Sequence, residues 1–167
     1  MNLSNVEFLN FIYPKIFFAV VTGAIIGFER GSRKAAAGFK THILICLGSM
    51  FYTTVPVILG FDMQVNDQHV IAQIVTGIGF LGAGAIIRNP VTEKPVQGLT
   101  TAADIWLVAA LGILVGLGLG WSVILISIIV VSITVTSRHI ERKFINGSGG
   151  NGGGSNGKDA SGKDSNC

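Results

Sequence analysis

The chain has 167 residues, of which 49% are hydrophobic and only 13% are charged, and its mean hydropathy is +0.60. A soluble domain usually carries about 25% charged residues, so this composition argues against an ordinary water-soluble fold. The net charge of +3 is modest, and the basic residues lie at the ends of apolar runs. That placement indicates orientation in a membrane and argues against nucleic acid as a partner. The two cysteines, Cys46 and Cys167, are too few for a disulfide framework or a zinc site.

Apolar runs of membrane length follow one another along the chain. A bilayer core about 30 Å thick requires about 20 helical residues. The expected helices cover residues 8–28, 43–61, 70–87, 99–117 and 121–137. The last two share one apolar stretch that is too long for a single crossing, so a hinge is expected between Gly116 and Gly120. The sequence predicts an all-α membrane protein, a bundle of five transmembrane helices.

One of these runs is compatible with a different structure. The stretch from Val123 to Val135 is rich in Val, Ile, Ser and Thr, and in water it would be typical of a buried strand in a soluble β-core. Four other runs of membrane length surround it, which favours the helical interpretation.

The basic residues predict how the bundle is oriented. They follow the first, third and fifth spans: Arg30, Arg33, Lys34 and Lys40, then Arg88 and Lys94, then Arg138, Arg142 and Lys143. Only Lys15 lies near the other side. Because cytoplasmic loops carry an excess of Lys and Arg, the N-terminus is predicted to lie outside and the C-terminus in the cytoplasm. No basic residue precedes the first apolar run, so a cleaved signal peptide fits poorly.

The composition changes abruptly after Ile145. Residues 146–167 are rich in Gly, Ser and Asn, and such a segment cannot bury enough apolar surface to fold by itself. We therefore predict a transmembrane domain over residues 1–145 and a disordered cytoplasmic tail over residues 146–167.

The third span is rich in glycine, at Gly77, Gly79, Gly82 and Gly84. The first three spell G-x-G-x-x-G, but a dinucleotide site needs this motif between a soluble strand and a helix. We interpret the four glycines as helix-packing residues, because small residues let helix backbones approach closely in a membrane. Gly77 and Gly84 share a face with Gln73 and Arg88. The third span is thus expected at the centre of the packing, and a ligand path along this face is the alternative.

Asp104 is the only carboxylate well inside an apolar span. It follows Thr100 and Thr101 by about one helical turn and Gln97 by about two, which predicts a stripe of oxygen-bearing side chains. Such ligands suit a hard cation such as Mg²⁺, although one carboxylate falls short of an octahedral site. The alternatives are a carboxyl group kept protonated by desolvation and an ion pair with Arg88, Lys94 or another cytoplasmic base.

Other polar residues mark the cytoplasmic membrane edge. Glu29 and Arg30 end the first span, and we interpret them as a salt bridge or headgroup contact, with a substrate gate as the alternative. Thr41 is a candidate N-cap of the second span. His42 is interpreted as an interfacial residue and not as a ligand.

Four blocks of this sequence resemble the MgtC/SapB family of bacterial inner-membrane proteins. They read GFER at 27–30, GFKTHILICLGS at 38–49, GIGFLGAGAII at 77–87 and GLTTAA at 98–103. Lys40 stands where the family usually has Arg, and Asp104 stands where a small or hydroxyl residue is expected. The resemblance places the family's cytoplasmic-edge motif at Glu29, Arg30, Lys40, Thr41, His42 and Arg88. The short, SapB-like form without a folded cytoplasmic C-terminal domain is expected.

The resemblance implies a multi-pass protein of the bacterial plasma (inner) membrane that is linked to magnesium homeostasis and, in pathogens, to survival in host cells. We expect no enzymatic activity and no cofactor, with Mg²⁺ as a candidate transported or sensed ion. Beside the lipid bilayer, the expected partners are a second copy of the chain or other membrane proteins. Two functions stay open: a regulator that acts through Gly-rich helix packing, and a cation transporter or channel lined by Asp104, Thr100 and Thr101.

Overall fold

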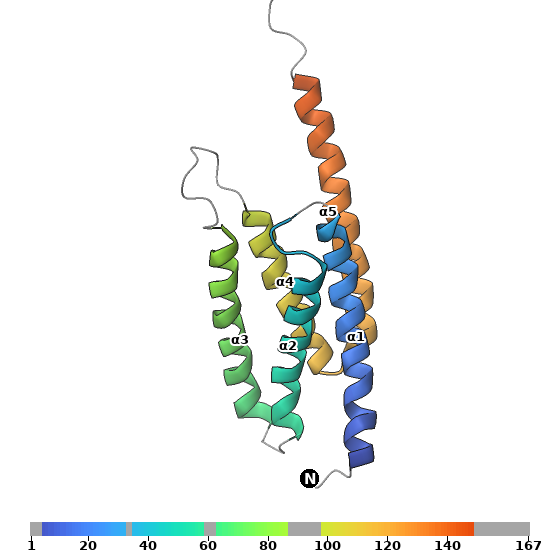
Figure 1. Cartoon of the computed structure of the whole chain (residues 1–167), viewed down its shortest axis with the longest axis vertical. Helices are drawn as coiled ribbons and strands as arrows, with labels where there is room; N and C mark the ends of the chain where they lie inside the picture. Colours follow the sequence, from blue (N-terminus) through green and yellow to red (C-terminus); the bar gives the residue numbers. More distant parts are fainter. Residues whose placement is uncertain (1–4, 33–34, 59–62, 87–97, 149–167) are drawn as a thin grey trace, which may run out of the picture. The chain divides into compact units, whose positions relative to one another are not determined.

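The computed structural model describes residues 5–32, 35–58, 63–86 and 98–148, and the regular structure in these ranges is entirely helical. The described residues form five helices (Figure 1): α1 (Asn5–Gly31), α2 (Phe39–Ile58), α3 (Met63–Ile86), α4 (Leu99–Gly116) and α5 (Gly120–Ser148). This confirms the all-α prediction. The β-core alternative is wrong, because residues 123–135 lie inside α5.

Several helix ends differ from the predicted ones. α2 begins at Phe39, so Thr41 lies inside its first turn and the prediction that Thr41 is the N-cap is wrong. α3 begins at Met63, well before the predicted residue 70. α5 continues to Ser148, past the predicted end of the last helix and into the predicted tail. Hydropathy marks the apolar part of a helix, whereas backbone hydrogen bonding continues into polar turns. The predicted tail from residue 149 onward lies outside the described residues.

Four helical segments in the described ranges are long and apolar enough to cross a membrane. They are Val6–Gly31, His69–Ile86, Leu99–Gly116 and Gly120–Ile140. The chain is therefore a helical membrane protein. α2 is not among these four segments, so the fifth crossing stays a prediction.

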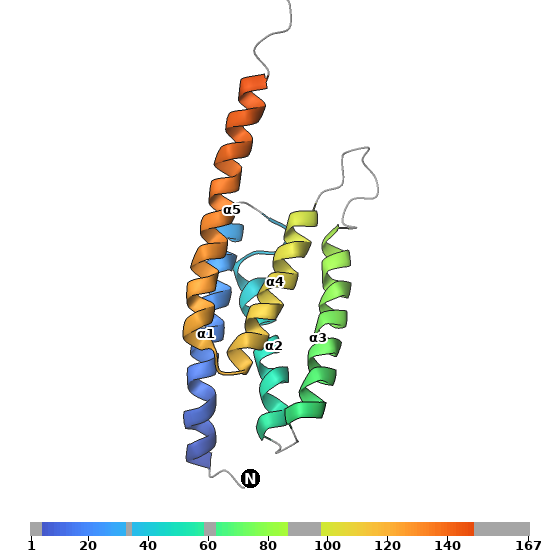
Figure 2. The same cartoon turned by 180° about the vertical axis from the view of Figure 1, so that it is seen from behind.

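The chain divides into two compact units, residues 1–132 and residues 133–167. The first unit holds α1 to α4 and the start of α5, and the second holds the rest of α5. In the first unit, α2 and α4 lie between α1 on one side and α3 on the other (Figures 1 and 2). The expectation that the third span lies at the centre of the packing is therefore wrong. Hydropathy and glycine content do not reveal which helix is central.

Glycine contacts define the direction of each helix pair. Gly23 of α1 packs on Ile43 of α2, and Gly27 packs on Phe39, so α1 and α2 are antiparallel. A Cβ at Gly23 would lie 2.6 Å from the Cα of Ile43, and one at Gly27 would lie 2.9 Å from the Cα of Phe39. No side chain fits at these distances, so the two backbones touch as small residues permit.

Similar contacts place α2 and α4 in parallel. Gly112 packs on Cys46, and Gly116 packs on Met50 and Thr53. α3 runs antiparallel to α4, with Gly82 facing Ala102. The ends of α1 and α3 therefore lie beside the starts of α2 and α4. We call this end of the first unit the basic end, because all Lys and Arg residues of this unit except Lys15 lie in or directly beside the connections there.

The hydrophobic core lies mainly where α1, α2 and α4 meet. Its fully buried members include Ala19, Cys46, Met50, Val108 and Val123. Hydroxyl groups in this core bond within their own helix: Thr53 and Thr54 each donate at 2.8 Å to the carbonyl four residues earlier. The polar side chains of α2 thus enter the core without unsatisfied hydroxyl groups at these two positions.

The turn between α4 and α5 is the predicted glycine hinge. Gly118 has a φ of +94°, which is a left-handed conformation that a residue without a Cβ adopts without strain. The Leu119 amide donates to the carbonyl of Leu114 at 3.0 Å. Trp121, directly after the turn, contacts Phe18 of α1 edge to face, with 5.2 Å between the ring centroids. The hinge prediction is confirmed.

Candidate functional site

A buried ion pair joins α1 and α4 at the basic end. Arg30 is 4% exposed and Asp104 is 6% exposed. Arg30 Nε lies 2.8 Å from Asp104 Oδ2, and Arg30 Nη2 donates to Oδ1 at 3.0 Å. This is the bidentate geometry that makes arginine pairs strong. Nε also lies 3.1 Å from Oε2 of Glu29. One guanidinium group therefore bridges carboxylates from two helices.

This geometry selects one of the interpretations of Asp104. Its ion-pair alternative is confirmed, and the base is Arg30. The two bases named from the sequence, Arg88 and Lys94, lie outside the described residues. The interpretation of Glu29 and Arg30 as a salt bridge is also confirmed. Sequence reasoning did not connect Arg30 with Asp104, because 74 residues separate them and only helix packing brings them together.

The oxygen-bearing stripe predicted on the fourth span is not gathered along one buried line. Thr101 is buried together with Asp104, whereas Thr100 is exposed. Gln97 lies outside the described residues. In the described part of the chain, no group of three or more His, Cys, Asp and Glu residues could hold a metal ion. What this part of α4 presents is an aspartate bound by arginine.

His42 lies inside the protein, and its level at the membrane interface stays a prediction. The side chain is 0% exposed, and a Cβ at Gly27 of α1 would lie 3.1 Å from the His42 Cβ. Nδ1 lies 2.8 Å from the Gly38 carbonyl oxygen, and Nε2 has no hydrogen-bond partner in the described part of the chain. Lys40 and Thr41 are exposed. The absence of a side chain at Gly27 lets α2 approach closely enough to bury His42.

A second contact joins α1 and α4 at the opposite end of the first unit. Lys15 Nζ donates to the Gly116 carbonyl oxygen at 2.6 Å and lies 4.1 Å from the centroid of the Phe11 ring. A cation at the C-terminus of a helix is favourable, because the last carbonyl groups have no partner within the helix. A lone lysine in an apolar run is the sequence signal for such a contact, but it does not identify the acceptor.

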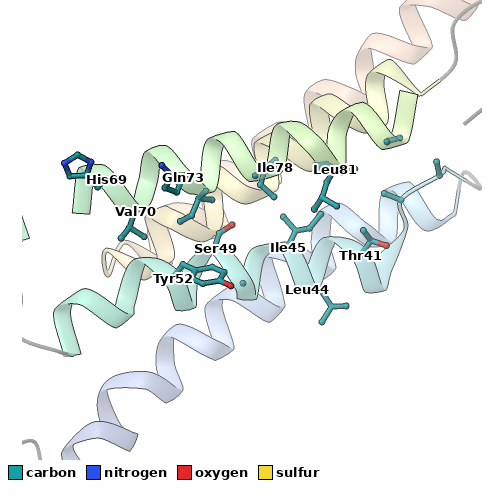
Figure 3. A pocket seen from close by; sticks show the side chains of 18 residues that line it. Thr41, Leu44, Ile45, Ser49, Tyr52, His69, Val70, Gln73, Ile78 and Leu81 are labelled. Carbon is teal, nitrogen blue, oxygen red and sulfur yellow. The ribbon is translucent and has the colours of Figure 1, made fainter. Parts of the chain in front are cut away.

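A groove runs between α2 and α3 (Figure 3). Its volume is about 1030 Å³. α3 contributes Val70, Gln73, Gly77, Leu81 and Gly84, which recur at intervals of three or four residues and so form one helix face. α2 contributes Thr41, Leu44, Ile45, Gly48, Ser49 and Tyr52. His69, Gln73 and Tyr52 lie toward one end of the groove and Thr41 toward the other (Figure 3).

The predicted packing glycines divide between the inside and the outside of the bundle. Gly82 packs within the chain, where its Cβ would lie 3.6 Å from that of Ala102. A Cβ at Gly77, Gly79 or Gly84 would meet nothing within 4 Å. Gly77 and Gly84 share the groove face with Gln73 as predicted. No other helix of the described chain packs directly against these two glycines. Their packing against a partner stays a prediction.

Comparison with known proteins gives a consistent set of relatives. Residues 16–143 match the model of the MgtC family. The chain is 42% identical over 115 residues to "Putative magnesium transporter YhiD" of Escherichia coli (strain K12). The aligned residues make up 65% of this chain and 52% of that protein. It is 38% identical over 122 residues to SrpB of Synechococcus elongatus. The aligned residues make up 68% of this chain and 66% of SrpB.

MgtC of Brucella abortus is a further relative. It is 42% identical over 101 residues, which covers 60% of this chain and 40% of MgtC. The chain spans about half the length of YhiD and less of MgtC. No solved structure matches the chain.

Proposed function

Because the chain belongs to the MgtC family, we propose that it serves magnesium homeostasis as a multi-pass protein of the bacterial inner membrane. In this role it regulates other membrane proteins through the packing of its helices and does not itself move the ion. The name of the relative YhiD supports the link with magnesium, and the four apolar helices support the membrane location.

The proposed topology has five crossings, with the N-terminus outside and the C-terminus in the cytoplasm. The basic end is then cytoplasmic. α2 supplies the fifth crossing, because it is parallel to α4 and packs along it from Cys46 to Thr53. Its polar residues Ser49, Thr53 and Thr54 are all buried, so they do not face lipid.

The open groove face of α3 is the observation that carries the regulatory function. Helix association in a membrane depends on close packing and on hydrogen bonds between helices. Gly77 and Gly84 supply close approach, and Gln73 supplies an amide, on a face that no other described helix covers. The pairing of Asp104 with Arg30 supports the same conclusion, since a carboxylate held by a guanidinium group is not available to a cation.

The alternative function is transport of Mg²⁺ or another cation. Asp104 and Thr101 are both buried in α4, and a path past them would require Arg30 to release the carboxylate. The buried acid is the specific observation that keeps this alternative open.

The two functions make different predictions for the purified protein in liposomes. We expect no Mg²⁺ uptake above that of empty vesicles under any gradient, measured with an enclosed Mg²⁺-sensitive dye. Uptake by the natural protein that Asp104→Asn abolishes would contradict the regulatory function.

The groove face is tested in cells that lack the natural gene and grow in low Mg²⁺. We expect Gly77→Leu to lose complementation, because its side chain fills the open face. Gly79→Leu is the matched control, since Gly79 is equally open but does not line the groove. Equal growth with both variants would show that the groove face is not needed.

A further inference from the structure

We propose that the groove between α2 and α3 is an interface between two copies of this chain, with α3 of each copy lying in the groove of the other. This inference rests on the proposed function for its membrane setting, and it goes further by naming the occupant of the groove.

The first argument is the hydrogen-bonding requirement of the groove. Gln73 is exposed on the groove face of α3, and it lies with His69 and Tyr52 toward one end of the groove (Figure 3). Gln73 is four residues inside the apolar segment that begins at His69, a depth of about 6 Å along the helix. An amide at that depth requires a partner, because hydrocarbon offers neither donors nor acceptors.

The second argument is symmetry. Two copies inserted in the same orientation are related by a two-fold axis along the membrane normal, so equivalent residues meet at equal depth. Gln73 then faces Gln73 of the second copy. A carboxamide both donates and accepts, so each amide can donate to the carbonyl oxygen of the other. Side chains of one charge would repel their own copies, and the described lining of the groove contains no Asp, Glu, Lys or Arg.

The third argument is shape. Gly77 and Gly84 are seven residues apart, with Leu81 between them, and all three line the groove. A seven-residue repeat keeps a parallel helix pair in register at the shallow crossing angle that is common in membrane bundles. The space of about 1030 Å³ beside the glycines receives Leu81 and Val70 of the second copy. α3 carries both the two glycines and the two larger apolar side chains on its groove face. Gly79, in contrast, lies on nearly the opposite side of the helix.

Disulfide trapping in native membranes tests the arrangement. The full chain carries Cys46→Ala and Cys167→Ser, and one new cysteine is placed by Gly77→Cys, Gly84→Cys or Gly79→Cys. A disulfide requires Cα atoms within about 7 Å. After oxidation with copper phenanthroline, we expect Gly77→Cys and Gly84→Cys to form a species of twice the chain mass in several-fold higher yield than Gly79→Cys. Equal yields at the three positions would overturn the proposal.

Other occupants of the groove give other results. A different membrane protein in the groove would give a cross-linked product of another mass, and a lipid would leave the Gly77→Cys chain monomeric. Either result would also overturn the proposal that a second copy of the chain occupies the groove.

A measurement on the otherwise natural chain does not depend on the cysteine substitutions. We expect Gln73→Leu to weaken the dimer in lipid vesicles roughly threefold or more, measured by energy transfer between labelled copies, because an interhelical hydrogen bond in a membrane contributes about that much. Gln73→Asn, which keeps the amide, is expected to retain part of the affinity. Unchanged association in both variants would contradict the amide pair.

The two proposals fail in distinguishable ways. If the Gly77 and Gly84 cysteines do not trap a dimer but Gly77→Leu still abolishes growth in low Mg²⁺, the groove serves another partner and the regulatory function stands. If the dimer forms and Gly77→Leu disrupts it without any effect on growth, the dimer stands and the proposed function fails.

Discussion

Arg30 shows how much one side chain decides in this bundle. It is almost fully buried, and its Nε lies within 3.1 Å of a carboxylate oxygen of Glu29 and within 2.8 Å of one of Asp104. A buried pair of this kind does not by itself guarantee stability, because desolvation of both ions opposes their attraction. Removal of one partner has a clearer effect, since it leaves the other charge buried without its compensation.

At this scale we predict that Arg30→Leu and Asp104→Leu each destabilise the protein by about 3–5 kcal/mol. The double variant should lose less than the sum of the two single losses, because it leaves neither Arg30 nor Asp104 without the other. Only Glu29 then loses its contact with Arg30. Unfolding in detergent, followed by circular dichroism, measures both effects. Lys40→Ala, at an exposed position, is the control and should change stability by less than about 0.5 kcal/mol. Strict additivity of the two single losses would contradict the pair.

At the scale of the helices, glycines do two different things. Gly23, Gly27, Gly112 and Gly116 form the contacts of α2 with α1 and α4, where a Cβ would clash with backbone or side-chain atoms. Gly77, Gly79 and Gly84 of α3 meet open space. The density of glycines in α3 suggested that this helix packs most closely, but the close contacts of α2 use the sparser glycines of α1 and α4.

This contrast predicts opposite effects of the same substitution. Gly23→Ala should destabilise the fold by about 1–3 kcal/mol, because its Cβ would lie 2.6 Å from the Cα of Ile43 and α1 must move away from α2. Gly79→Ala should be neutral or stabilise by up to about 1 kcal/mol, since alanine favours the helix and nothing obstructs its methyl group. Thermal unfolding of both variants in the same detergent measures the difference. Equal effects would show that helix propensity alone decides.

At the scale of the whole molecule, the crossing of the membrane by α2 determines the topology. α2 is parallel to α4 and antiparallel to α1, and both of these helices are apolar enough to span. A helix held between them over this length has little room to lie on the surface. The topology therefore depends on packing as well as on hydropathy.

Cysteine labelling in intact cells tests this topology. On a background without the natural cysteines, Gly60→Cys follows α2 and should react with a membrane-impermeant maleimide from outside. Lys94→Cys, between α3 and α4, should react only after the cells are permeabilised. If α1 and α3 crossed but α2 did not, the access of the two positions would be exchanged: Lys94→Cys would react from outside and Gly60→Cys only after permeabilisation.

The sequence by itself determined the helical class, the membrane setting, the hinge at Gly118 and the resemblance to the MgtC/SapB family. These features depend on composition, on run length and on local backbone preference, which short stretches of sequence carry. Only the tertiary structure decided that Arg30 pairs with Asp104, that His42 is buried beside Gly27, and that Gly77 and Gly84 line an open groove. Such contacts depend on the rotation and crossing of helices that are far apart in the chain, and all-round apolar helices in a membrane lack the amphipathic pattern that would reveal which face turns inward.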